Sequence, residues 1–98
     1  MEKRTPHRRL SVVRQLVEAG QVRETMVASI GALSMGLSRE EMIDVVRKLT
    51  MADFLKSMTS ARDHRLWQDV YRPMTKGGRA YVKLMVVEDV LVVSFKEL

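Results

Sequence analysis

The chain has 98 residues, 46% of them hydrophobic and 30% charged, a composition typical of one globular domain, residues 1–98, with a single modest core. It contains no cysteine, which excludes disulfide bonds and thiolate zinc sites. Its two histidines, His7 and His64, lie far apart in sequence, so we expect no metal site, and we expect no other cofactor. No apolar run is long enough to span a membrane and no secretory signal is visible, so we expect a cytoplasmic protein.

The formal net charge of +5 is concentrated toward the two ends of the chain. Residues 1–23 and 62–98 are rich in Lys and Arg, whereas basic and acidic groups are nearly balanced in residues 24–61. Basic surfaces attract polyanions such as RNA or DNA. Charge also keeps a protein soluble without any such partner, so charge alone leaves both interpretations open.

The first half of the sequence predicts helices with clear start and stop signals. Thr5–Pro6 is suited to the N-cap and first position of a helix that ends at Gly20. Ser38 and Glu41 form a capping box, in which each side chain bonds to a backbone N–H at the start of a helix that runs to residue 49. The same pattern at Thr50–Asp53 predicts one further turn.

A second helix is expected between these two, after a short connector. It should run from Glu24 to about Met35 and bury Val27, Ile30 and Leu33. Gly31 weakens this prediction because an internal glycine costs a helix about 1 kcal/mol relative to alanine.

The second half predicts four successive strands, and therefore an antiparallel sheet. Two strands surround a polar loop within residues 53–73, and two more follow at 80–87 and 91–96. Helices first and strands afterwards predict an α+β fold, with the N-terminal helices packed on one face of a mainly antiparallel C-terminal sheet.

Two turns set the expected register of the strands. A two-residue turn at Gly77-Gly78 pairs Lys76 with Arg79 and places Arg72 opposite Lys83. A turn at Glu88-Asp89 places Tyr81 opposite Lys96 and Lys83 opposite Ser94. Since side chains alternate between faces, one face is a core face. Its expected members are Trp67, Asp69, Tyr71, Val82, Leu84, Val86, Leu91, Val93 and Phe95.

The other face, called the second face below, combines cations with an aromatic ring and an amide. Its expected members are Gln68, Arg72, Tyr81, Lys83, Ser94 and Lys96, together with Val70, Met85 and Val92. A solvated sheet face is often merely polar. Lys and Arg beside an aromatic ring are also what binding to an RNA backbone requires, because cations hold phosphates and a ring stacks on a base.

The loop around Asp63-His64-Arg65 decides where Lys56 lies. A two-residue turn would bury Lys56 on the core face, whereas a three-residue turn places it opposite Arg72 on the second face and places Met58 beside Val70. Burying an unpaired lysine is costly, so we expect the three-residue turn.

Four segments carry a resemblance to a known family: MEKRTPH at 1–7, FLKSMT at 54–59, WQDVYRP at 67–73 and VLVVSFKE at 90–97. On these segments the chain resembles the bacterial motility quorum-sensing regulator toxins, small messenger-RNA interferases of the RelE-like superfamily. The similarity runs essentially end to end and is weaker in residues 24–35 and 39–49.

The resemblance implies a toxin of a type II toxin–antitoxin system that cuts messenger RNA near GC-containing triplets and arrests growth. It implies inhibition by a cognate antitoxin with zinc-binding and helix-turn-helix domains. The family's proposed site positions fall here on Lys56, Gln68 and Tyr81, with Met58, Arg72 and Lys96 alongside. Lys83 joins them from the predicted sheet face.

The predicted roles follow from metal-independent cleavage by the ribose 2′-OH. Lys56 is the expected base, with a pKa depressed by neighbouring cations. Tyr81 is the expected acid or stacking platform, and Gln68 orients the 2′-OH or the phosphate. Arg72, Lys83 and Lys96 hold the phosphate.

Two other classes of protein fit the same residues. A non-catalytic nucleic-acid-binding module would use the same basic face and bind RNA without cutting it. A protein-interaction or transcription-regulating subunit would act through its helices, so that substitutions on the sheet face would leave its function intact.

Overall fold

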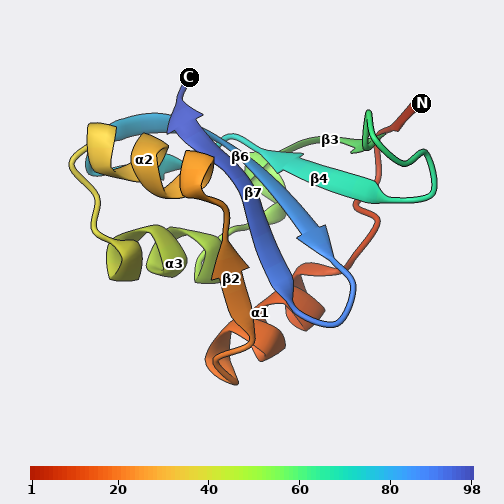
Figure 1. The fold of residues 1–98 in the computed structure, drawn as a ribbon, viewed down its shortest axis with the longest axis horizontal. Helices are drawn as coiled ribbons and strands as arrows, with labels where there is room; N and C mark the ends of the chain where they lie inside the picture. The colour runs from red at the N-terminus through yellow and green to blue at the C-terminus, as the bar shows by residue number, and fades with distance from the viewer.

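The computed structural model describes residues 1–98 and has three α-helices and one extended sheet (Figure 1). The helices are α1 (Leu10–Glu18), α2 (Met26–Ser34) and α3 (Arg39–Arg47), followed by a 3-10 turn at Met51–Asp53. The strands are β1 (Glu2–Lys3), β2 (Val22–Glu24), β3 (Phe54–Thr59), β4 (Trp67–Tyr71), β5 (Met74–Thr75), β6 (Gly78–Val86) and β7 (Val90–Glu97).

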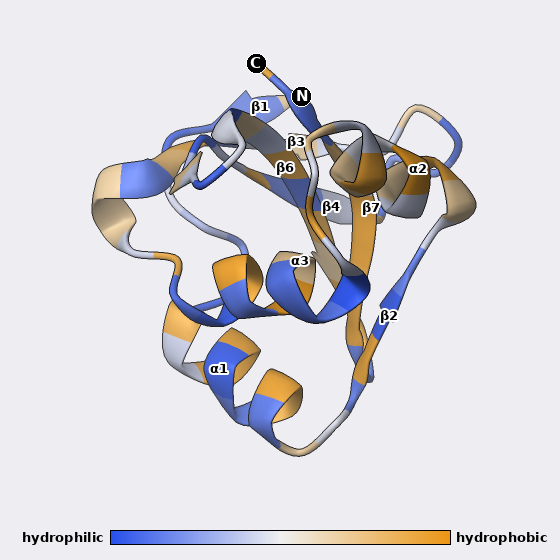
Figure 2. Ribbon diagram, turned by 90° about the vertical axis from the view of Figure 1, so that its left-hand side faces the viewer, coloured by the Kyte–Doolittle hydropathy of each residue, from blue (hydrophilic) through white to orange (hydrophobic).

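The main path of the sheet has the strand order β1-β3-β4-β6-β7-β2, and β5 pairs with β6 off this path. All pairings are antiparallel except that of β2 with β7, which is parallel. Figure 2 shows α2 and α3 in front of the strands β6 and β7, with α1 below α3, so the helices lie on one side of the sheet. The predicted α+β fold, with helices on one sheet face, is therefore confirmed.

The core lies between the helices and this covered face of the sheet. Helix α1 contributes Leu10, Val13 and Val17, and helix α3 contributes Met42 and Val46. The sheet supplies Tyr71, Val82, Leu84 and Phe95, which are almost completely buried. None of the three α-helices has both the length and the apolar character needed to cross a membrane.

The predicted start of the first helix is wrong. Helix α1 begins at Leu10 rather than at Thr5–Pro6, and no side chain caps it. The backbone N–H groups of His7 and Arg8 donate instead to the carboxylate of Asp69, at 2.9 and 3.0 Å. A long-range partner thus holds this segment in a bent, non-helical path where local signals favoured a helix.

The second helix exists, but its buried face is the opposite of the predicted one. Ala28 and Ala32 are buried, whereas Val27, Ile30 and Leu33 are 69%, 57% and 65% exposed. The helix is apolar nearly all round (Figure 2), so hydrophobic periodicity could not identify the buried side. Small residues face the sheet because α2 packs directly against the backbone of β7.

The segment at 21–23, predicted to be a connector, contributes to strand β2. Its residues pair in parallel with β7, in the register Val22 with Val90 and Glu24 with Val92. Parallel pairing with a strand at the other end of the sequence gives no local turn signal, which explains why the sequence did not reveal it.

Both capping boxes are confirmed. Glu41 N–H donates to the Ser38 hydroxyl at 3.1 Å, and Ser38 N–H donates to the Glu41 carboxylate at 2.9 Å. The reciprocal pair between Thr50 and Asp53 caps the 3-10 turn that was expected there.

The hairpin at residues 76–79 is shifted by one residue from its predicted position. Met74 lies opposite Arg79 and Thr75 opposite Gly78, so the turn is Lys76-Gly77. The Thr75 hydroxyl accepts from Gly77 N–H and donates to the Gly78 carbonyl, which stabilises this earlier turn. Moving the turn by one residue changes each cross-strand partner by two residues. Because side chains alternate between the faces, a change of two residues leaves every side chain on its predicted face.

The predicted pairing of β6 with β7 holds only on one side of a bulge. Tyr81 lies opposite Lys96 and Lys83 opposite Ser94, as expected, but the register then shifts so that Leu84 faces Val92. Backbone N–H and hydroxyl of Thr25 donate to the consecutive carbonyls of Val92 and Val93 at this point.

The bulge exchanges the faces of the residues that precede it on β7. Val92 is buried and Leu91 and Val93 are half-buried, contrary to the prediction. Because Leu91 and Val93 leave the core face, they add apolar surface to the second face.

Candidate active site

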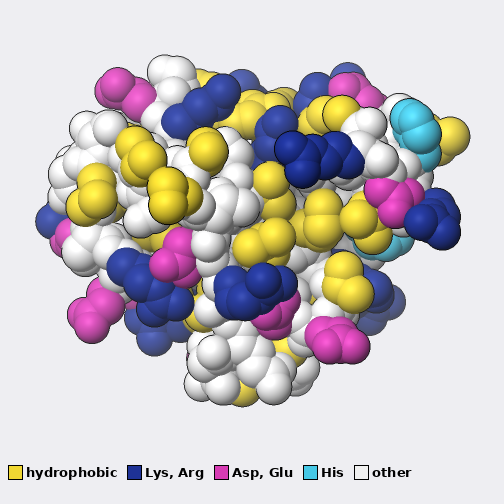
Figure 3. All heavy atoms as spheres, in the orientation of Figure 1, with side chains coloured by type: hydrophobic (Ala, Val, Ile, Leu, Met, Phe, Trp, Pro, Cys, Tyr) yellow, Lys and Arg dark blue, Asp and Glu magenta, His cyan; other side chains and the backbone are white.

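A row of side chains crosses four strands on the second face. Lys56 on β3 lies opposite Val70 on β4, Val70 lies opposite Lys83 on β6, and Lys83 lies opposite Ser94 on β7. Val70 is completely buried and gives this row an apolar floor between two lysines. Figure 3 views this side of the molecule and shows dark blue Lys and Arg side chains beside a yellow apolar area over β6 and β7.

A second row surrounds the aromatic ring of Tyr81. The ammonium groups of Lys96 and Lys83 lie 5.5 and 5.8 Å from the centre of that ring. Arg72 follows the end of β4, and its backbone N–H donates to the carbonyl of Asp53. Arg72 and Lys96 are exposed, so their charges are available to a ligand.

Met58 and Gln68 form the third part of the face. They lie opposite each other on β3 and β4 and are half-buried. The prediction placed Lys56 opposite Arg72 and Met58 opposite Val70, and both pairs are wrong by two residues. The reason is the length of the loop, because Ser60 N–H donates to the Leu66 carbonyl and leaves five residues in the connection.

Their strand registers place six of the seven predicted residues on one face of the sheet: Lys56, Met58, Gln68, Tyr81, Lys83 and Lys96. The seventh, Arg72, directly follows the last residue of β4 and is exposed. One further residue, which the sequence pattern did not indicate, contacts Lys56 on this face. Strand β1 places Glu2 opposite Met58, and the Glu2 carboxylate lies 2.7 Å from the Lys56 ammonium. A two-residue strand is too short to show an alternating pattern. The sequence offers no other signal for Glu2 than its place in the segment MEKRTPH, which carries the family resemblance.

The depressed pKa expected for Lys56 is not found. The hydrogen bond from its ammonium to Glu2 raises the pKa of Lys56, and the same contact lowers the pKa of Glu2. Lys56 is therefore protonated at neutral pH and Glu2 is ionised. The assignment of Lys56 as the base is corrected accordingly, and Lys56 is suited to holding a phosphate oxygen.

A buried carboxylate supports the second face from the other side of the sheet. Asp69 is 4% exposed and accepts hydrogen bonds from the Ser57 hydroxyl and from the backbone N–H groups of His7 and Arg8. It was expected on the core face, where it lies. Its bonds fix the chain between β1 and α1 against the neighbours of Lys56 and Gln68.

Two aromatic side chains pack together beside this carboxylate. The rings of His7 and Trp67 stack with 5.6 Å between their centres, and the Lys3 ammonium lies 4.2 Å from the Trp67 ring centre. Trp67 was expected in the core and is half-buried under these two residues. Burial and then the charge of Lys3 lower the pKa of His7.

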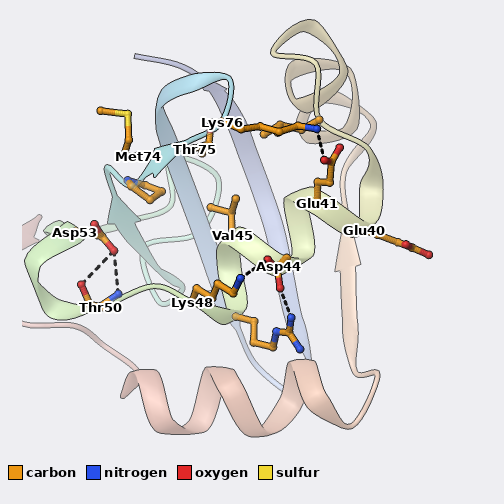
Figure 4. Close-up of a pocket in the computed structure, with 13 residues that line it drawn as sticks. Glu40, Glu41, Asp44, Val45, Lys48, Thr50, Asp53, Met74, Thr75 and Lys76 are labelled. Carbon is orange, nitrogen blue, oxygen red and sulfur yellow. Dashed lines mark hydrogen bonds and ion pairs between the residues drawn. The ribbon is translucent and has the colours of Figure 1, made fainter.

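One cavity lies away from the second face. It has a volume of about 800 Å³ and opens between α3 and β5 (Figure 4). Two of its carboxylates form ion pairs, Glu41 with Lys76 and Asp44 with Lys48 and Arg47. None of the seven predicted site residues lines it. No group of three or more His, Cys, Asp or Glu side chains is arranged to hold a metal ion.

Comparison with known proteins identifies the family. Residues 5–97 match the family described as motility quorum-sensing regulator, toxin of MqsA. The chain belongs to this toxin family. It is also 55% identical over 97 residues to the mRNA interferase toxin MqsR of Escherichia coli strain K12, a match that covers 99% of each protein. Membership of the toxin family confirms the resemblance that the four sequence segments indicated.

Proposed function

We propose that this chain is a messenger-RNA endoribonuclease, the toxin of a type II toxin–antitoxin system, and that it binds and cuts RNA on the second face. The main support is the 55% sequence identity, over 97 residues, to a protein named as an mRNA interferase toxin. The gathering of four cations around Tyr81 and Gln68 supports the location, because RNA offers a phosphate at every nucleotide.

In the proposed reaction the ribose 2′-OH attacks the adjacent phosphorus. Arg72, Lys83 and Lys96 hold the phosphate and stabilise the charge that develops on its oxygens, an effect typically worth about 2.7–4 kcal/mol for one donor. Lys56 joins them as a cation, since it is protonated at neutral pH. Gln68 orients the attacking hydroxyl, Tyr81 protonates the leaving 5′-oxygen or stacks on a base, and Met58 contacts a base.

The family description also supports a protein partner. It names a toxin of MqsA, so we infer that this chain binds a cognate antitoxin, and that this antitoxin carries zinc-binding and helix-turn-helix domains. Preference for GC-containing triplets, absence of any metal requirement and a bacterial cytoplasmic location are parts of the same proposal. Expression of this chain alone should then arrest bacterial growth, and co-expression of its antitoxin should relieve the arrest.

The proposal is tested by incubating the purified chain with a defined RNA and determining the chemical ends of the fragments. The expected fragments end in a 2′,3′-cyclic phosphate and begin with a 5′-OH. Cleavage should continue in EDTA. RNA binding without scission would instead support the non-catalytic module, and cleavage lost in EDTA and restored by one divalent ion would contradict the metal-free mechanism.

A further inference from the structure

The proposed reaction needs a group that takes the proton from the 2′-OH, and the seven residues of the second face do not supply one readily. Lys56 is held protonated by Glu2, and three of the others are Arg72, Lys83 and Lys96. An amide such as Gln68 does not titrate, and a free tyrosine with a pKa of about 10 is a poor base at neutral pH. The residue required is a carboxylate or an imidazole.

Glu2 is the carboxylate that reaches this face. Its contact with Lys56, 2.7 Å from Oε2 to Nζ, is the single ion pair made by the four cations of the second face. The Glu2 side chain is 56% exposed, so a bound ribose can approach it without any rearrangement of the core.

Strand β1 holds Glu2 in this position. Thr59 N–H donates to the Met1 carbonyl at 3.0 Å, and Lys3 lies opposite Ser57 on β3. Because neighbouring side chains point to opposite faces, Glu2 shares the second face with Met58 and Lys56. Lys3 lies on the other side, where its ammonium contacts the Trp67 ring.

We propose that Glu2 is the general base of the RNA cleavage, an inference that rests on the function proposed above. Its carboxylate takes the 2′-OH proton while the 2′-oxygen bonds to phosphorus and the bond from phosphorus to the 5′-oxygen breaks. An acid of the second face returns a proton to the 5′-oxygen. The products are a 2′,3′-cyclic phosphate and a 5′-OH, so no other reactant is consumed.

The pairing with Lys56 suits this role in two ways. The hydrogen bond and charge of Lys56 lower the pKa of Glu2, so the carboxylate is ready to accept a proton at neutral pH. A phosphate that binds Lys56 competes for its ammonium group and weakens the ion pair between Lys56 and Glu2. The proton affinity of Glu2 therefore rises when RNA is bound, and a base with a pKa nearer the working pH is the more effective one.

A purely electrostatic role for Glu2 predicts a different effect of its removal on the cleavage rate. If the carboxylate only neutralised Lys56, it would compete with the RNA phosphate for that ammonium. Its removal would then tighten RNA binding and leave cleavage unchanged or faster. A base, in contrast, leaves binding intact or tighter when it is removed but slows the chemical step.

The test is single-turnover cleavage of a defined RNA by the full chain carrying Glu2→Gln, with saturating protein and a separate measurement of RNA affinity. We expect cleavage to slow by about 10²-fold or more, with affinity equal to or higher than that of the unmodified chain. Glu88→Gln is the matched control, because it removes one negative charge from the exposed turn between β6 and β7. It should cleave at the unmodified rate, and both variants should keep the unmodified melting curve.

Chemical rescue separates a base from a structural role. Formate added to the Glu2→Ala variant should restore part of the cleavage rate in proportion to its concentration, and should not accelerate the unmodified chain. If the unmodified chain cuts RNA and Glu2→Gln cuts it equally fast or faster, Glu2 is not the base, while the proposed function stands. If the unmodified chain cuts no RNA, both proposals fail.

Discussion

The Ser57 hydroxyl donates to the Asp69 carboxylate across β3 and β4 at 2.6 Å, in a contact that is buried on the core side of the sheet. Each partner lies directly beside a residue of the second face, Ser57 between Lys56 and Met58, and Asp69 after Gln68. The same carboxylate binds the backbone before α1. One buried group thus connects the two strands of the site with the segment that follows β1.

Asp69→Ala should therefore lower both stability and activity. It removes the charged acceptor of the His7 and Arg8 N–H groups, and hydrogen bonds to a charged group typically contribute about 1.5–3 kcal/mol. Loosening this segment also frees β1, so cleavage should fall. Urea titration and a cleavage assay measure the two effects. Ser57→Ala is the milder control, since both backbone bonds remain, and it should cost about 0.5–1.5 kcal/mol. Equal stability of the two variants would show that the backbone bonds contribute nothing.

Gly31→Ala should destabilise the protein, although alanine is the better helix former by about 1 kcal/mol. An added Cβ at this position would lie 1.7 Å from the carbonyl oxygen of Phe95, which is backbone and cannot move aside. Overpacking of this kind typically costs about 1–3 kcal/mol. Thermal unfolding measures the difference. A higher melting temperature for Gly31→Ala would mean that α2 does not approach β7 so closely.

Ile30→Ser should leave stability within about 0.5 kcal/mol of the unmodified value, because Ile30 is 57% exposed. Met42→Ala on α3 is the buried counterpart and should cost roughly 2–5 kcal/mol, since Met42 is completely buried. Both values come from chemical denaturation. A large loss for Ile30→Ser would support the buried face that the sequence predicted for α2.

The sequence predicted the membership of each sheet face better than the pairing of its residues. Side chains alternate between the two faces, so a register shift of two residues keeps each side chain on its face. The shifts at both the Gly77 turn and the Asp63 loop are of two residues, and Lys56 and Lys83 therefore stayed on the second face. The odd shift at the β7 bulge moved Val92 into the core. It depends on bonds from Thr25, a residue far away in sequence, that no local pattern encodes.

The remaining errors share this non-local origin. The segment before α1 follows Asp69 rather than its own helix signals, and β2 pairs with a strand at the far end of the chain. Glu2 joins the site only because β1 pairs with β3. By contrast, the capping boxes at Ser38 and Thr50 are confirmed because each is complete within four residues.

Tyr71→Phe should stabilise the protein by about 1 kcal/mol. The Tyr71 ring is completely buried and packs edge-on against Phe54, but its hydroxyl has no hydrogen-bond partner. Phenylalanine keeps the ring and removes an unsatisfied polar group, and such a group costs about 1–3 kcal/mol when buried. A decrease in the free energy of unfolding would show that the hydroxyl has a partner.

The same hydroxyl predicts how stability changes at high pH. Burial, and secondarily the charge of Asp69, raise the pKa of Tyr71 above its ordinary value. The folded protein therefore holds this proton more tightly than the unfolded chain does. This contribution to stability is complete below about pH 10 and is lost as the pH rises further. Tyr71→Phe should remove that loss, which denaturation at pH 8 and pH 11 would reveal.

If the second face of the sheet cuts RNA, substitutions on it should slow cleavage without unfolding the protein. The most direct measurement is the single-turnover cleavage rate of variants of this face, compared with their melting curves. Tyr81→Phe and Lys96→Ala should slow cleavage and change stability by no more than about 0.5 kcal/mol. Leu84→Ala, on the core face, should lose roughly 2–5 kcal/mol of stability but cleave at the unmodified rate at temperatures where it remains folded. Unmodified cleavage by both face variants would contradict RNA cleavage by the second face.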